Sequence, residues 1–440
     1  MHVETLEVTG VRGFYGDRSV ELDFRRPDGS LAGWTVLAGR NGSGKSTLLQ
    51  ALALVLSGPR ATAVIPSLSD WINNDTDRAR LSASLELSDE ETPQLGLFSP
   101  VVWTELQRPA QATAEEAYSP EPEVAGEGLD SYSRARRTSV VSSSRPWFYV
   151  GYGPFRHLQD ATTRKVTRPG PSAQIGSLFD ETIALADAVD WLIEQRLYEY
   201  EDRPGAAELI HIVMALLNHG LLPDGFQVSE VNSDGLWISY QNKEFPLREM
   251  SDGYKTVTAL VVDIVRRVWL SYPQLEITFD NGVPTLPYSG VVLIDEIEAH
   301  LHVNWQKAIG RWLKTHFPAI QFIVTTHSPY ICQSADQAGI ILMPGPAEQR
   351  PPRIIDDELY RRIIYGSGED AVLTELFGVD TPYSPEAEKM RDRLGDLEIK
   401  VLDGSASAEE IAEYRELNRA LTSSLSTRAE EVVRRLEREQ

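Results

Sequence analysis

A glycine-rich run that ends in lysine and serine carries the strongest chemical signal in the sequence. Glycines let backbone N–H groups surround phosphate oxygens, and a helix that starts at the lysine adds the positive end of its dipole. In such a loop the lysine reaches the β- and γ-phosphates and the serine hydroxyl ligates Mg²⁺. The pattern G-x-x-x-x-G-K-[ST] is matched without a mismatch by Gly39, Arg40, Asn41, Gly42, Ser43, Gly44, Lys45 and Ser46. We therefore expect ATP and Mg²⁺ as cofactors, with the nucleotide bound by these residues and by Thr47, which follows the loop.

Two consecutive carboxylates end an apolar run further along the chain. Residues 291–294 are Val-Val-Leu-Ile, and Asp295 and Glu296 follow. A short, wholly apolar run is typical of a buried parallel strand, and ligands of α/β sheets bind beyond the carboxyl ends of such strands. We expect Asp295 to hold Mg²⁺ through water and Glu296 to act as the general base that polarises the attacking water. The alternative is a solvent-exposed acidic turn.

A histidine follows a second apolar run. Residues 320–324 predict another buried strand, and His327 comes three residues after it. This strand lies one helix and one strand beyond the acidic pair, so His327 can sit on the neighbouring strand's end. There it would hydrogen-bond the γ-phosphate or the attacking water, and the alternative is a structural histidine. We group His327 with Lys45 and Glu296 as candidate catalytic residues.

Hydrophobic periodicity predicts the elements that position these residues. Ser251 is a good N-cap, and Gly253 permits close backbone approach at the start of a helix over residues 252–270. Ser407 and Glu410 predict a capping box at the start of a C-terminal helix. Strands are predicted near residues 6–8, 20–24, 34–38, 81–87 and 147–151, with a hairpin over 228–240, and helices over 46–56, 179–201, 206–220 and 303–315.

Composition limits the classes of protein that fit. The chain has 440 residues, 42% hydrophobic and 24% charged, which excludes wholesale disorder and a fibrous protein. Its net charge of −23 disfavours a broad nucleic-acid-binding surface. Cys332 is the single cysteine, so disulfides and multi-cysteine zinc sites are excluded. The sequence has no apolar stretch near ~20 residues and no signal-peptide pattern, so we expect a cytoplasmic protein without a membrane span.

The order of these motifs resembles the ABC-type ATPases, within them the SMC, RecF and OLD-like branch. Ser251, Asp252 and Gly253 stand at the signature loop, which is usually Leu-Ser-Gly-Gly, with Met250 in place of leucine. Residues 298–302 stand at the D-loop, and their Glu-x-His-Leu-His form resembles the compact ATPases of prokaryotic anti-phage systems. Residues 151–156, Gly-Tyr-Gly-Pro-Phe-Arg, resemble a motif of those ATPases near the Q-loop.

The resemblance implies a mechanism and further site residues. Two protomers would sandwich ATP head to tail, so that residues 251–253 of one chain contact the γ-phosphate held by Lys45 of the other. The resemblance leaves open whether the dimers assemble into a higher oligomer. Gln159 would be the Q-loop glutamine and a metal ligand, and Arg12 and Phe14 would contact the adenine. His300 and His302 alone make an incomplete metal site, so a D-loop at the dimer interface is the favoured interpretation.

The resemblance also implies a domain organisation and a function. The predicted fold class is α/β, an ABC ATPase head with a mixed sheet and flanking helices, carrying a helical insertion and a helical C-terminal extension. The function it favours is an ATPase that gates an effector nuclease supplied in trans for anti-phage defence, because the extension lacks the strand pattern of a Toprim nuclease. The alternatives are a RecF-like DNA-maintenance ATPase, which would bind DNA, and a transporter subunit. The predicted segments are 1–108 with the phosphate loop, a disordered insertion at 109–146, the Q-loop region at 147–175, a helical insertion at 176–222, the second ATPase part at 223–345 and the extension at 346–440.

Overall fold

The computed structural model describes residues 1–57, 69–87, 101–107, 148–156 and 174–421, apart from residues 182, 184, 273, 380 and 382. The predicted insertion at 109–146 and Gln159 lie outside the described residues. The chain divides into two compact units, residues 1–378 and residues 379–440. The phosphate loop, the signature loop, the acidic pair and the histidine motif all belong to the first unit.

A six-stranded sheet forms the centre of the first unit. Its strand order is β15-β14-β3-β13-β12-β6, and all neighbours pair in parallel except β14 and β15, so the sheet is mixed. The carboxyl ends of the parallel strands therefore meet at one edge, as an α/β binding site requires. The strands span Trp34–Ala38 (β3), Tyr149–Tyr152 (β6), Gly290–Ile294 (β12), Ile320–Thr326 (β13), Ile340–Leu342 (β14) and Arg353–Ile354 (β15).

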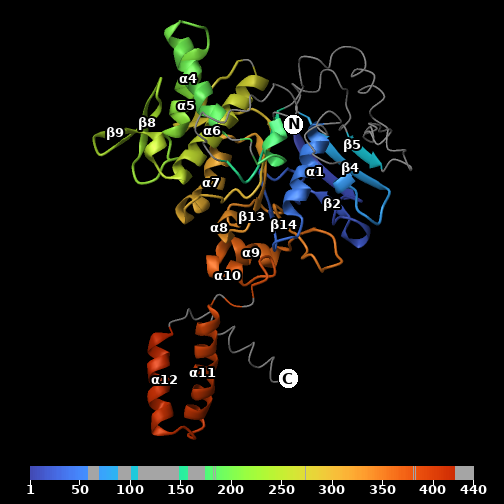
Figure 1. The fold of residues 1–440 in the computed structure, drawn as a ribbon, viewed down its shortest axis with the longest axis vertical. Coiled ribbons are helices and arrows are strands. Elements are labelled where there is room, and N and C mark those ends of the chain that lie inside the picture. The colour runs from blue at the N-terminus through green and yellow to red at the C-terminus, as the bar shows by residue number, and fades with distance from the viewer. Residues whose placement is uncertain are drawn as a thin grey trace. The chain divides into compact units, whose positions relative to one another are not determined.

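A second, antiparallel sheet packs on one face of the first, with a helix between them. Its order is β2-β1-β4-β5. Helix α1, Lys45–Ser57, shares one hydrophobic core with strands of both sheets, and ten of its thirteen residues are buried. This explains why its sequence is apolar almost all round. Figure 1 shows α1 beside β2, β4 and β5. The strands span His2–Thr9 (β1), Val20–Asp23 (β2), Arg78–Glu86 (β4) and Val101–Gln107 (β5).

Helices cover the other face of the central sheet. A second core joins them to the remaining side chains of the central strands and to the three-stranded sheet β7-β8-β9. Figure 1 shows α4 to α7 gathered on this side. The elements are α4 (Ala186–Tyr200), α5 (Ala206–Leu217), β7 (Gln227–Asn232), β8 (Gly235–Tyr240), β9 (Lys243–Pro246), α6 (Asp252–Ser271), β10 (Thr278–Asp280), β11 (Val283–Thr285), α7 (Val303–His316), α8 (Pro329–Cys332), α9 (Asp357–Tyr365) and α10 (Gly368–Val372).

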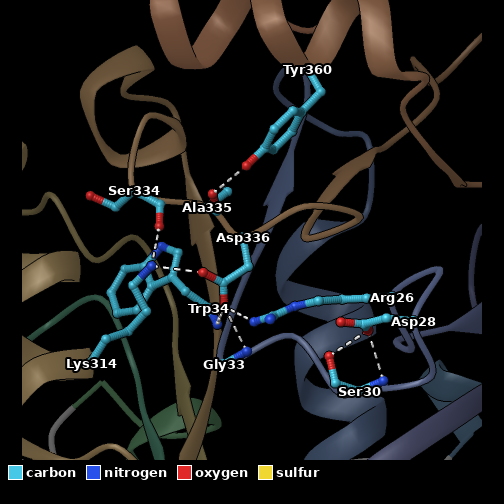
Figure 2. A network of polar contacts seen from close by, with 10 residues as sticks. All are labelled: Arg26, Asp28, Ser30, Gly33, Trp34, Lys314, Ser334, Ala335, Asp336 and Tyr360. Atoms are coloured by element: carbon cyan, nitrogen blue, oxygen red, sulfur yellow. Dashed lines mark hydrogen bonds and ion pairs between the residues drawn. The ribbon is translucent and has the colours of Figure 1, made fainter.

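A partly buried carboxylate, that of Asp336, fixes the start of β3, the strand that leads into the phosphate loop. Oδ2 of Asp336 accepts from the backbone N–H groups of Gly33 and Trp34 at 2.7 and 3.0 Å and from the guanidinium of Arg26 at 2.8 Å. Its Oδ1 accepts from Nζ of Lys314 at 2.8 Å. Figure 2 shows this carboxylate between the strand and the lysine. The contacts tie the loop before β3 to helix α7.

The second unit contains a helical hairpin. Helix α11 spans Pro385–Leu402 and α12 spans Ala408–Ala420. The predicted capping box is present, because Ser407 Oγ accepts from Glu410 N at 3.2 Å while Ser407 N donates to the Glu410 carboxylate at 2.8 Å. An ion pair between Arg393 and Glu413, at 2.7 Å, joins the two helices.

The predicted α/β class with a mixed sheet and flanking helices is confirmed. Helix α4 differs from its prediction, because it begins at Ala186 and a 3₁₀ turn at Gly176–Leu178 precedes it. Strand β5 and the short strands β9, β10, β11, β14 and β15 have no counterpart among the predicted elements. Within the described residues, no helix is both long and apolar enough to cross a membrane.

Candidate nucleotide-binding site

The phosphate loop joins β3 to α1 in a conformation that glycine makes possible. Gly42 and Gly44 have φ of +74° and +92°, in the left-handed region that other residues avoid. A Cβ at Gly44 would lie 2.6 Å from the ring of Phe14, which is 1% exposed and packs beneath the loop. Phe14 therefore supports the loop in this structure and presents no face to a base.

Lys45 is held inside the loop. Its Nζ donates to the carbonyl oxygens of Gly39 and Arg40, both at 3.0 Å, and the residue is only 6% exposed. Burial lowers the pKa of Lys45, and the nearby charge of Asp295 opposes that shift. Charged oxygens of a phosphate would be stronger acceptors for this ammonium than the two carbonyls are.

The loop and the acidic strand meet at one carboxylate oxygen. Oγ of Ser46 donates to Oδ1 of Asp295 at 3.1 Å, although the two residues are 249 positions apart. Thr325, at the end of β13, donates to the same oxygen. Its hydroxyl also accepts from the backbone N–H of Glu296 at 2.7 Å. Two of the three predicted Mg²⁺ ligands, Ser46 and Asp295, are thus in contact, and Thr325 joins them to the predicted base.

Sequence reasoning did not single out Thr325. Its only signal is a hydroxyl residue near the carboxyl end of an otherwise apolar strand, where functional side chains of α/β proteins gather. The residue is completely buried. Thr326, its neighbour, donates to the carboxylate of Glu298 at 2.7 Å, so consecutive threonines hold two different acids.

Glu296 and His327 lie at the same edge of the sheet. Glu296 is partly exposed and has a left-handed φ of +46°. The His327 side chain is exposed, and its backbone N–H donates to Glu298. Burial lowers the pKa of His327, and the positive charge of Lys45 lowers it further, while Glu298, Glu296 and Asp295 oppose the shift. The three candidate catalytic side chains therefore act on one another electrostatically.

Residues 251–253 open helix α6. Ser251 and Asp252 are exposed, and Asp252 pairs with Lys255 at 2.8 Å. Gly253 is buried, and a Cβ there would lie 2.6 Å from the carbonyl oxygen of His300. The start of the helix thus packs directly against the backbone of the predicted D-loop, which only glycine allows.

Arg12 lies beside the first turn of α1. Its guanidinium donates to Oγ1 of Thr47 at 3.3 Å and stands 4.5 Å from the centre of the Trp71 ring. Burial lowers the pKa of Arg12, and Asp70 opposes that shift. Trp71 belongs to no recognisable motif, so it could not be selected from its sequence context. Arg12 remains placed next to the phosphate loop, whereas Phe14 lies under it.

The residues of the site fit a Mg²⁺-bound nucleotide. Ser43 is 1% exposed, and its Oγ has no hydrogen-bond partner among the residues that the structure describes. One carboxylate and one hydroxyl, from Asp295 and Ser46, suit Mg²⁺, which takes few protein ligands and completes its shell with water and phosphate.

Among the described residues, His300 and His302 of the predicted D-loop are not joined by the further ligands that a metal site would need. The described part of the chain contains no group of three or more His, Cys, Asp or Glu side chains that could hold a metal ion. Instead His302 caps helix α7 by accepting from Asn304 N at 3.3 Å.

Two family models match the chain. The model described as "AAA domain, putative AbiEii toxin, Type IV TA system" matches residues 194–333, and a model described as "AAA domain" matches residues 5–92. The first match contains the signature, acidic and histidine motifs, and the second contains the phosphate loop. Together they place both halves of the candidate site in sequence regions that these models describe.

Curated relatives carry the names Septu and retron. The chain is 27% identical over 329 residues to the Septu protein PtuA of Bacillus mycoides, covering 74% of this chain and 38% of the relative. It is 40% identical over 118 residues to the "Retron Ec83 probable ATPase" of Escherichia coli, covering 27% and 20%. The Septu protein PtuA of Bacillus thuringiensis is 23% identical over 389 residues, covering 87% and 86%. The predicted likeness to these ATPases is confirmed. The chain spans well under half the length of the first two relatives.

Solved structures of SMC heads are also similar. An SMC head bound to the C-terminal winged-helix domain of ScpA is 19% identical, with a TM-score of 0.48, and the match covers 81% of this chain and 98% of that one. The SMC head domain from Thermotoga maritima is 16% identical with a TM-score of 0.42, covering 81% and 100%.

Proposed function

We propose that this protein binds and hydrolyses ATP with Mg²⁺. The observation that carries the proposal is the contact of Ser46 and Thr325 with one oxygen of Asp295, which joins the phosphate loop, the acidic strand and the histidine strand. Ser46 and Asp295 would hold Mg²⁺, which neutralises charge on the β- and γ-phosphates when bound. Lys45 would bind the same phosphates. Glu296, beside that contact, would accept the proton of the attacking water.

We further propose that ATP joins two copies of the chain. Ser251 is exposed at the N-cap of α6, yet its side chain makes no capping hydrogen bond. The N-cap serines Ser367, Ser384 and Ser407 do make that bond. The Ser251 hydroxyl and the positive end of a twenty-residue helix are thus both available to an anion. A γ-phosphate held by Lys45 of a second chain is that anion.

The biological role that we propose is control of an effector in anti-phage defence. The support is the likeness to Septu and retron ATPases. The effector would be a nuclease in trans that responds to the nucleotide state. The DNA-maintenance alternative needs a basic surface, and the net charge of −23 opposes it.

Turnover and assembly are tested with one set of variants. Glu296→Gln should bind ATP as the wild type does, lose about 10²–10⁴-fold in turnover, and elute as an ATP-loaded dimer. Lys45→Ala should lose ATP binding and elute as a monomer. Glu244→Gln is the matched control, because it makes the same charge change at an exposed position of β9. Wild-type turnover in Glu296→Gln would show that the base is assigned wrongly.

The effector is tested by purification of Glu296→Gln with ATP and Mg²⁺ together with the products of its neighbouring genes. Mass spectrometry should find a nuclease in the dimer fraction and lose it with Lys45→Ala. A dimer that carries DNA and no second protein would favour the DNA-maintenance alternative instead.

A further inference from the structure

A buried arginine lies behind the acidic pair. Arg156 is 2% exposed, and its guanidinium donates to the carbonyl oxygens of Gly153, Asp295, Glu296 and Ile297 at 2.7, 2.6, 2.8 and 3.3 Å. Burial lowers the pKa of Arg156 to about 10, and nearby carboxylates oppose the shift, so the group stays charged at neutral pH. Removing such a charge from water is costly. The hydrogen bonds to the turn after β12 are what offset that cost.

That turn carries the proposed base in an unfavourable conformation. Glu296 has a φ of +46°, in the left-handed region that a residue with a side chain adopts only at an energetic cost. Three consecutive carbonyls, from Asp295 to Ile297, point to one guanidinium, and the Glu296 N–H is bonded to Thr325. Both sides of the turn are therefore held. The hydrogen bonds from Arg156 and Thr325 fix the orientation of the Glu296 backbone, and with it the direction in which the Glu296 side chain leaves the turn.

The same segment is attached to the helix that starts at the signature loop. Oγ1 of Thr256 donates to the backbone carbonyl of Arg156 at 3.3 Å. The hydroxyl of Tyr152 donates to Asp263 at 3.0 Å. Thr256 and Asp263 are seven residues apart on α6, so they lie on one face of the helix. Residues 152–156 thus connect α6 to the turn that bears Glu296.

We propose that Arg156 is a positioning residue for Glu296 and that it connects the start of α6 to the proposed base. The inference rests on the proposed hydrolysis of ATP. Only a planar guanidinium presents enough fixed donors for four carbonyls, because a lysine ammonium has three donors on one point. No contact between Arg156 and nucleotide is needed for this role.

The first test is the kinetics of Arg156→Lys. It should bind ATP within about two-fold of the wild type and lose about 10- to 100-fold in kcat, the range seen when groups that orient a ligand are removed. Arg18→Lys is the matched stability control, because Arg18 is 5% exposed and also donates to backbone carbonyls, at Gly13 and Gly345. It measures what loss of a buried guanidinium costs the fold. A kcat within two-fold of the wild type in Arg156→Lys would overturn the inference.

A double-mutant cycle separates positioning from a general loss of structure. If Arg156 acts through Glu296, Arg156→Lys should change single-turnover hydrolysis hardly at all in the Glu296→Gln background. Fully additive losses would overturn the inference. If Glu296→Gln alone keeps wild-type turnover, the proposed base fails. If Glu296→Gln loses turnover and Arg156→Lys does not, only the positioning role fails.

A milder variant tests the connection to α6. Thr256→Val keeps the side-chain shape and removes the hydrogen bond to Arg156. We expect a fall of a few-fold in kcat with unchanged ATP affinity and little change in urea midpoint. An unchanged kcat would refute the connection to α6. This variant also covers the case in which Arg156→Lys yields no folded protein.

Discussion

Asp336→Asn tests how β3 is held at the end opposite the phosphate loop. An asparagine oxygen at the Oδ2 position can still accept from Gly33 and Trp34, but its amide then turns N–H groups toward Lys314. The variant thus loses a charge-assisted bond, worth about 1.5–3 kcal/mol, and the ion pair with Arg26. Lys314 and Arg26 are each 30% exposed, and Lys314 keeps its bond to Ser334 at 2.9 Å, which limits the loss. We expect about 2–3 kcal/mol of lost stability.

The assay is urea unfolding followed by tryptophan fluorescence. Trp34, fully buried with its backbone in the network, is one of nine tryptophans whose emission follows unfolding (Figure 2). The expected loss corresponds to a midpoint shift of about 0.7–1 M at an m value of about 3 kcal/mol/M. Asp28→Asn is the matched control, because Asp28 is exposed and its carboxylate accepts from the backbone N–H and hydroxyl of Ser30. The control should show no measurable shift.

The stability that Asp336 contributes should depend on pH in one direction. Burial raises the pKa of Asp336, but the hydrogen bond and charge of Lys314 and the charge of Arg26 bring it below its ordinary value of 3.8. A carboxylate with a depressed pKa contributes its stability above the unfolded value and loses it as pH falls through the folded value. The difference in the free energy of unfolding between the wild type and Asp336→Asn should be constant from about pH 8 to 5. No gap at pH 7, or a gap that narrows before about pH 4.5, would refute the reasoning.

Three other predictions concern a glycine, a histidine and the cysteine. Gly44→Ala should reduce ATP affinity at least about ten-fold by calorimetry, because of its positive φ and the 2.6 Å approach to Phe14, whereas Gly13→Ala, with open space at its Cβ, should not. Burial lowers the pKa of His316 below 6.5, and its ring is hydrogen-bonded to the carbonyl oxygen of Pro284 at 2.6 Å. The unfolded chain then binds a proton more readily than the folded one, so the free energy of unfolding should fall as pH drops below about 6.5. The urea midpoint of His316→Gln should fall less over the same pH range. Burial raises the pKa of the Cys332 thiol and keeps solvent and reagents away from it. A thiol reagent should therefore react with Cys332 only after unfolding. Rapid labelling of the native protein would contradict this.

The central strands and the phosphate loop could be predicted because their sequences are unambiguous. The strand over 34–38 has the predicted bounds, since a short apolar run that ends in a glycine-rich loop has few other structures. The capping box at Ser407 follows from local chemistry alone. Helix α4 begins later than its periodicity suggested, because Leu185 at its N-cap offers no capping side chain that would mark the start. Strands of two to four residues, such as β15, are too short to show a period.

The roles of Thr325, Asp336 and Arg156 could not be predicted, since their partners are distant in the sequence. Arg156 bonds residues about 140 positions away, and Asp336 bonds residues about 300 positions away. A buried arginine with carbonyl partners leaves no pattern of spacing. The resemblance of residues 151–156 to a family motif pointed to the segment, while the guanidinium's four hydrogen bonds became visible only in three dimensions.

The register of the central sheet connects its packing to the proposed chemistry. Val291 and Leu293 belong to the core beneath α1, while Val292 and Ile294 belong to the core beneath the other helices. Ile294 pairs with Val324, so the next residues, Asp295 and Thr325, come side by side. A slip of one residue in β12 would exchange the two faces of the strand and place Ile294 or Glu296 opposite Thr325. Two separate apolar cores oppose that slip. The position of Asp295 next to Ser46 therefore depends on the apolar side chains of both cores as well as on the hydrogen bonds within the site.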